Sequence, residues 1–157
     1  MAYPDGFTYV SGPYELRRFN VLSTATFKAR VPVNLSAARV IQEMPIVSNY
    51  ITGIAMNDAA NSIYGSEILV MVPNEQTVFA TITDTGLAAS VLSQGFSYNI
   101  KKSGNNFRLD TASQATARVT IVPRGDGTTI DSTDSSIFVQ FLQTFIYPFA
   151  SVASTVQ

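Results

Sequence analysis

The side chains of this sequence that could do chemistry are carboxylates, lysines and tyrosines, because the chain contains no histidine and no cysteine. Their absence excludes a Ser-His-Asp triad, a Cys-His nucleophile, thiol redox chemistry and any ordinary zinc site. Two carboxylates that face each other across a cleft can hydrolyse a glycosidic bond. Only four glutamates are present, however, and no spacing marks a catalytic pair. We therefore expect no enzymatic activity and no cofactor.

Oxygen ligands gather in the polar stretch over residues 124–136, which reads RGDGTTIDSTDSS. Asp126, Asp131 and Asp134 are the kind of ligand that hard cations such as calcium take from loops. Their spacing does not follow the EF-hand pattern, and no glutamate comes after them. A solvated acidic loop is the simpler interpretation, and we predict no metal ligands. The Arg-Gly-Asp tripeptide at 124–126, which integrins bind in some adhesion proteins, is too short to be specific.

The composition bounds the possible partners. A chain of 157 residues is the length of one domain, and only 13% of its residues are charged, about half the usual ~25%. The net charge of −1 argues against nucleic-acid binding, which needs many neutralised phosphates. The start MAYPDGF lacks the pattern of a secretory signal, and the apolar stretch over 137–150 is too short for a membrane helix. We expect neither a nucleic-acid nor a membrane partner.

Apolar and polar residues alternate along most of the chain, and this alternation is typical of half-buried strands. Strands are predicted over residues 26–33, 67–72, 77–83, 96–101, 107–111, 117–122 and 137–146. Short connections predict two hairpins, 67–72 with 77–83 and 96–101 with 107–111. Residues 36–44 fit a helix or a strand, and residues 86–94 fit one helical turn. We predict an all-β fold, a single compact β-barrel or sandwich over residues 16–146.

The two ends differ from the middle by combining proline and glycine with aromatic residues. We predict extended arms, an N-terminal arm over residues 1–15 and a C-terminal tail over residues 147–157. Aromatic side chains without a local sheet to cover them often anchor an arm on a neighbouring protein. The alternative is that they fold back on their own domain. The aromatic residues predicted to lie at a protein interface are Tyr3, Phe7, Tyr9, Tyr14, Tyr147 and Phe149.

The few charges are unevenly spread along the chain. Residues 1–40 carry five basic and two acidic residues, whereas residues 41–157 carry five basic and nine acidic ones. Arg17, Arg18, Lys28 and Arg30 are therefore candidates for contact with an acidic protein surface, unless the split is chance in a small count. A strand over 26–33 would direct Lys28 and Arg30 to one face as a single basic spot. A strand over 117–122 would likewise direct Arg118 outward, opposite Val119 and Ile121.

The order of pieces over residues 50–146 resembles a known family. The pieces are YITGIAMNDAA (50–60), GSEILVMVP (65–73), TVFAT (77–81), GLAASVLSQGFSYNI (86–100), NFRLD (106–110), ARVTIVPRG (117–125) and SIFVQFL (136–142). Together they are similar to the small β-barrel capsid decoration, or cement, proteins of tailed bacteriophages. The first 45 residues add nothing to this resemblance.

The resemblance implies a structural virion protein that sits on the outer capsid surface and stabilises contacts between major capsid subunits. It further implies the major capsid protein as partner and self-association as a dimer or trimer on the capsid. A different class of function, a carbohydrate- or receptor-binding module of a phage tail or fibre, is the alternative. That alternative needs exposed aromatic side chains over a groove, and the lack of tryptophan counts against it. A small hydrolase is a third and weaker hypothesis.

Overall fold

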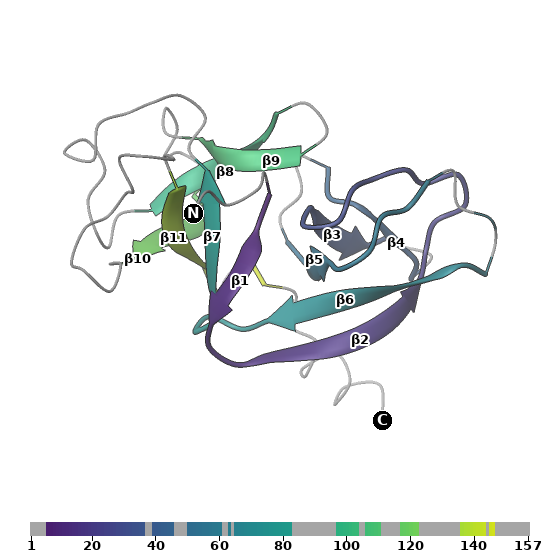
Figure 1. The fold of residues 1–157 in the computed structure, drawn as a ribbon, viewed down its shortest axis with the longest axis horizontal. Coiled ribbons are helices and arrows are strands. Elements are labelled where there is room, and N and C mark those ends of the chain that lie inside the picture. Colours follow the sequence, from purple (N-terminus) through teal and green to yellow (C-terminus); the bar gives the residue numbers. More distant parts are fainter. Residues whose placement is uncertain are drawn as a thin grey trace.

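The computed structural model describes residues 6–36, 39–45, 50–60, 63, 65–82, 97–103, 106–110, 117–122, 136–143 and 145–146. Over this part of the chain the fold is all-β, without a helix, and consists of two antiparallel sheets packed together (Figure 1). The sheets do not close into a barrel, so the predicted all-β class is confirmed in its sandwich form.

Eleven strands build the two sheets over the described residues. The six-stranded sheet has the order β1-β7-β11-β10-β8-β9, and the five-stranded sheet has the order β2-β6-β5-β3-β4. The strands are β1 (Thr8–Ser11), β2 (Tyr14–Asn20), β3 (Pro32–Leu35), β4 (Ile41–Glu43), β5 (Gly53–Ala55), β6 (Glu67–Pro73), β7 (Val78–Ile82), β8 (Ser97–Ser103), β9 (Asn106–Asp110), β10 (Val119–Val122) and β11 (Ser136–Phe141).

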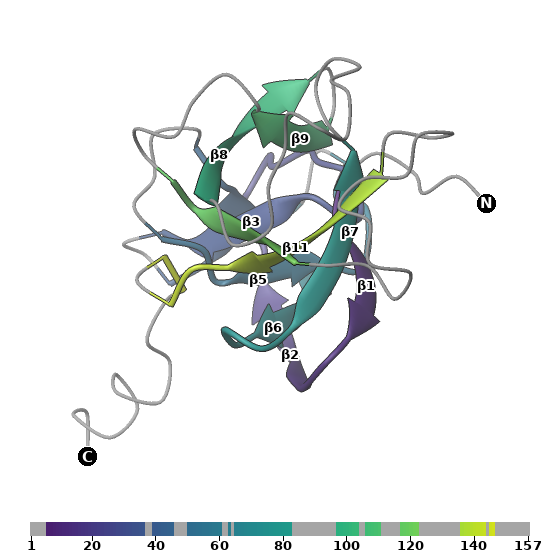
Figure 2. The ribbon, with the colours of Figure 1, turned by 90° about the vertical axis from the view of Figure 1, so that its left-hand side faces the viewer.

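One bent ribbon joins the two sheets. β1 pairs with β7 in the larger sheet, and β2 pairs with β6 in the smaller one. The two segments of the ribbon, β1–β2 and β6–β7, therefore cross from sheet to sheet at the same corner. Figure 2 shows β1 beside β7 and β2 beside β6 on either side of this bend. The strands of the two sheets therefore run steeply across each other, as in orthogonal sheet packing, where strands switch sheets through bends.

Gly12 and Thr77 hold the corner of the ribbon. Gly12 has a φ of +95°, and a Cβ built there would lie 2.4 Å from the carbonyl oxygen of Gln76. Only glycine combines this backbone conformation with so close an approach. The buried Thr77 hydroxyl donates a hydrogen bond to the carbonyl of Pro13, and it accepts one of 3.0 Å from the amide of Asn74. The bend is thus fixed by contacts from both segments of the ribbon.

This corner corrects the first predicted hairpin. Residues 67–72 and 77–83 do contain β6 and β7, but the two strands lie in different sheets and do not pair with each other. The connection at Asn74–Gln76 turns the chain from one sheet into the other. The second hairpin is confirmed, because β8 pairs with β9 from Asn99↔Asp110 to Ser103↔Asn106.

The core between the sheets is centred on aromatic rings. Phe7, Phe79 and Phe141 are each at most 1% exposed, and their ring centroids lie 5.1 to 6.4 Å apart. Burying a side chain of this size contributes about 1.5–3 kcal/mol of transfer free energy. Phe145 extends the cluster, with its ring 6.0 Å from that of Phe141.

The prediction of an N-terminal arm is wrong for the segment that includes Phe7. The segment over residues 6–15 is part of the sandwich rather than an arm, because β1 and the start of β2 each pair within a sheet. The alternative interpretation of the sequence, that these aromatic residues fold back on their own domain, describes Phe7. Residues 1–5 and the predicted tail over 147–157 lie outside the described residues.

The predicted strand over 26–33 is also wrong for most of its length. Phe27 forms an isolated bridge with Ala59, Arg30 has a φ of +71°, and β3 starts only at Pro32. Phe27, Val31 and Val33 are nevertheless buried, because a bridge and a turn reproduce the alternation of a strand at these positions.

Three other predicted elements have clearer outcomes. The strand over 137–146 is confirmed only as far as Phe141, where β11 ends, and β4 places a strand at the end of the ambiguous segment 36–44. In β10 Val119 and Ile121 face inward as predicted. The helical turn over 86–94 and the acidic loop up to residue 135 lie outside the described residues.

Candidate interaction surface

Two tyrosines mark the outer side of the corner. Tyr9 in β1 and Tyr14 at the start of β2 place their ring centroids 4.8 Å apart at an angle of 66°. The Tyr9 hydroxyl donates a 2.7 Å hydrogen bond to the carbonyl of Gly12, between the two strands. Tyr9 is 36% exposed and Tyr14 is 44% exposed. The bend therefore fixes a pair of aromatic rings that remain accessible to a partner.

β2 continues this accessible surface away from the corner. Alternation along the strand places Tyr14, Leu16 and Arg18 on one face, and Leu16 is 49% exposed. In the paired strand β6, Met71 lies opposite Leu16 on the same face. An exposed leucine between a tyrosine and an arginine, on a rigid strand, is a surface with both apolar area and positive charge.

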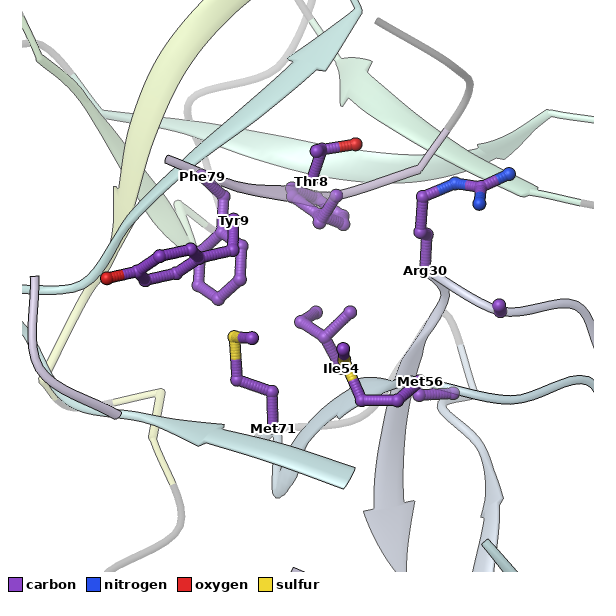
Figure 3. A pocket seen from close by; sticks show the side chains of 10 residues that line it. Thr8, Tyr9, Arg30, Ile54, Met56, Met71 and Phe79 are labelled. Carbon is purple, nitrogen blue, oxygen red and sulfur yellow. The ribbon is translucent and has the colours of Figure 1, made fainter. Parts of the chain in front are cut away.

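A cleft of about 310 Å³ adjoins the tyrosine pair between β1 and the smaller sheet (Figure 3). Tyr9 and Phe79 line one side, Ile54 and Met71 line its floor, and Arg30 lies at the opposite rim. Met56, also in the lining, is 40% exposed. Methionine side chains adapt their shape to a contacting surface, so this cleft can accept an apolar side chain of a partner.

We call Tyr9, Tyr14, Leu16, Arg18, Arg30 and Met56 the bend surface. The sequence already singled out the two tyrosines and the two arginines. It missed Leu16, although the alternation of YELRRFN places that residue between Tyr14 and Arg18. It also missed Met56, for which no local pattern gave a signal.

The predicted basic set is not brought together. Arg17 lies on the opposite face of β2 from Arg18, and its guanidinium is 3.1 Å from the carboxylate of Glu15. Both of these side chains are exposed, so such an ion pair contributes only about 0–1 kcal/mol.

Lys28 and Arg30 do not form the single basic spot that the sequence predicted. The Lys28 ammonium is 3.9 Å from the carboxylate of Asp58, and Lys28 lines a separate cavity of about 190 Å³ together with Glu43 and Lys102. Arg30 lines the cleft beside Tyr9. The turn at Arg30 separates the two side chains, and acidic groups offset the charge around Lys28.

The other predicted interface residues divide into two groups. Phe7 is 1% exposed, so its ring belongs to the core and its side chain is not an interface anchor. Tyr3, Tyr147 and Phe149 lie outside the described residues.

Arg118 is a buried cation where an exposed one was predicted. It is 3% exposed, and its guanidinium carbon lies 5.2 Å from the centre of the Phe145 ring. Burial lowers the pKa of the Arg118 guanidinium from its usual value, because the charged form loses hydration. The Arg118 amide donates to the carbonyl of Tyr98, and its carbonyl accepts from the amide of Leu142, so the backbone here lies between two neighbouring segments while the Phe145 ring lies over the side chain.

Within the described ranges no group of three or more acidic residues is placed to hold a metal ion. No helix in that same part of the chain is long and apolar enough to cross a membrane. Comparison with known proteins found no matching family model, no similar curated protein and no similar solved structure.

Proposed function

We propose that this protein is a structural virion component that binds the outer surface of a phage capsid and stabilises contacts between major capsid subunits. The observation that carries the proposal is the bend surface, where exposed aromatic and aliphatic side chains lie beside arginines on a fixed corner of the sandwich. The resemblance of residues 50–146 to capsid decoration proteins supplies the class of partner.

The physical character of the bend surface fits a protein partner. Tyrosine, methionine and arginine are enriched at protein interfaces, and the energetically dominant contacts are usually aromatic or arginine side chains. Tyr9 and Tyr14 are held by the ribbon and by the Tyr9 hydrogen bond to Gly12, so little side-chain entropy remains to be lost on binding.

Co-sedimentation with empty capsids of the encoding phage, prepared without this protein, tests the proposal. Wild-type protein should pellet with the capsids in a saturable way. Tyr14→Ala should weaken binding by at least tenfold, since truncating a central aromatic side chain at an interface costs about 2 kcal/mol or more. Ile63→Ala is the matched control, because Ile63 is 75% exposed and lies outside the bend surface. Failure of the wild-type protein to pellet at any concentration would refute capsid binding.

The cleft beside Tyr9 favours one alternative, a carbohydrate- or receptor-binding module of a phage tail or fibre. Exposed tyrosine rings next to a cleft of about 310 Å³ could stack on a sugar ring. A glycan array separates the two hypotheses. A specific glycan signal that is lost in Tyr9→Ala, with no capsid binding, would support the alternative and contradict the capsid proposal.

A further inference from the structure

β2 is the longest terminal strand of the two sheets over the described residues. It has seven residues, whereas the other terminal strands β1, β9 and β4 have four, five and three. Proteins usually keep edge strands short or interrupted, because an exposed edge is a template for pairing with another strand. The length and exposure of β2 therefore need a reason.

The direction of its backbone groups shows which residues would pair. The amide of Val21, just after β2, donates to the carbonyl of Ser66 on the β6 side. Since backbone groups alternate in direction along a strand, those of Tyr14, Leu16, Arg18 and Asn20 point to the opposite edge. Leu22 continues this series, and its amide donates to the carbonyl of Ile41 across that edge. The outward groups from Tyr14 to Asn20 are thus correctly oriented for a further antiparallel strand.

We propose that β2 pairs antiparallel with β2 of a second copy of this chain, about a two-fold axis through Leu16. In this register Leu16 lies opposite the partner's Leu16, Tyr14 lies opposite the partner's Arg18, and Glu15 lies opposite the partner's Arg17. The two five-stranded sheets would then join into one continuous sheet across the dimer. The inference concerns the isolated protein and does not depend on the proposed capsid function.

Charge selects this register. Pairing the outward-pointing groups with one another requires an even-numbered residue opposite an even-numbered one. A shift of the axis to Glu15 places two glutamates opposite each other, and a shift to Arg17 places two arginines opposite each other; like charges directly opposite are destabilising. With the axis at Leu16, two Glu15–Arg17 pairs form across the strands. The side chains of this pair are exposed and already 3.1 Å apart within one chain, so a small rotation redirects them to the partner.

The remaining side chains of the strand match the same register. Leu16, 49% exposed, would cover itself with its symmetry mate, and an arginine beside a tyrosine ring gains a cation–π contact. A two-fold interface uses the same patch twice, so a self-complementary strand is what it needs. The alternating sequence Tyr-Glu-Leu-Arg-Arg over 14–18 provides that self-complementarity.

A five-residue strand pair is small for a specific interface, so the dimer should be weak. Sedimentation velocity of the full chain at concentrations from roughly 1 to 300 µM therefore tests for it. Wild-type protein should shift from monomer to dimer over this range. Leu16→Pro should weaken the dimer by at least tenfold, because it removes an outward amide and none that faces β6. Its thermal unfolding, followed by circular dichroism, checks that the variant folds. A monomeric wild-type protein throughout the range would overturn the proposal.

Charge reversal tests the register independently of folding defects. Glu15→Arg alone and Arg17→Glu alone should each weaken self-association by roughly tenfold or more, since each places like charges opposite each other. The double variant Glu15→Arg/Arg17→Glu should recover dimerisation, and an equimolar mixture of the two single variants should form a heterodimer. If the double variant dimerises no better than the single ones, the register is wrong.

Cysteine cross-linking locates the axis, because the chain has no cysteine of its own. Leu16→Cys should form a disulfide-linked dimer under mild oxidation, since hydrogen-bonded partners in an antiparallel pair have Cα atoms about 5.5 Å apart, within disulfide range. Arg18→Cys is the matched control, because its symmetry mate would lie about 13 Å away along the strand. Equal cross-linking of the two variants, or stronger cross-linking of Arg18→Cys, would contradict an axis at Leu16.

Discussion

Alanine substitutions at three glycines separate the two reasons why the ribbon corner requires glycine, the backbone conformation and the close approach of another segment. Gly12→Ala meets two obstacles: a φ of +95° that alanine rarely adopts, and a Cβ only 2.4 Å from the carbonyl oxygen of Gln76. Gly65→Ala meets only the first, because its φ is +88° and nothing lies within 4 Å of the added Cβ. Gly53→Ala meets only the second, with a Cβ 2.3 Å from the carbonyl of Met71.

The expected losses of unfolding free energy follow from these geometries. The left-handed conformation costs a non-glycine residue about 1–2 kcal/mol, and a forced shift of packed backbone costs about 1–3 kcal/mol. Gly65→Ala should therefore lose about 1–2 kcal/mol, and Gly12→Ala about 2–5 kcal/mol. In a chain of this size, each kcal/mol lowers the melting temperature by roughly 2–4 °C.

Urea and thermal unfolding followed by circular dichroism, on the three alanine variants in parallel, measure these losses. The urea midpoint of Gly12→Ala should lie well below that of Gly65→Ala. Gly53→Ala should also be less stable than the wild-type protein. If Gly12→Ala unfolds at the same urea concentration as Gly65→Ala, the corner is not closely packed. The account of a fixed ribbon bend, on which the tyrosine pair depends, would then be refuted.

Two other perturbations of the same ribbon have defined outcomes. Thr77→Val keeps the shape of the side chain but removes the hydroxyl that bonds Pro13 and Asn74, and should cost about 1–3 kcal/mol in urea unfolding; an unchanged unfolding midpoint would show that this hydroxyl does not hold the corner. Deleting residues 1–13 removes β1 and the buried ring of Phe7, so the melting temperature should fall sharply or cooperative unfolding should disappear. A truncated protein that melts like the full chain would restore the interpretation of this segment as an arm.

The capsid proposal and the dimer proposal share Tyr14, Leu16 and Arg18 of β2, but each has its own measurement. Self-association through the β2 edge is measured without any capsid. Capsid binding depends on Tyr9, Tyr14 and the cleft, and is measured by co-sedimentation. A protein that dimerises but does not pellet with capsids would retain only the strand-pairing inference.

The class of fold and much of the core could be predicted from the amino-acid sequence. Alternation identified the strands β8, β9 and β10, because in each of them one face is buried and the other is not. The turn at 102–106 predicted the β8–β9 hairpin, because that pairing is local and needs only a short connection. Phe107 and Leu109 take the apolar positions of the alternation in β9, and both are fully buried.

The pairing of strands that are distant in the sequence, or separated by a bend of the chain, could not be predicted and is known from the structure. Alternation reports that a face is buried but not what covers it, so β6 and β7 looked like a hairpin although the corner sends them to different sheets. Phe7 looked like part of an arm because β7, its neighbour in space, lies some seventy residues away. Lys28 and Arg30 looked like one basic spot because a turn at positive φ can bury the same alternate residues as a strand while directing its polar side chains apart. The tyrosines and arginines of the candidate interaction surface were therefore visible in the sequence, but only the bend shows that Tyr9 and Tyr14 lie together.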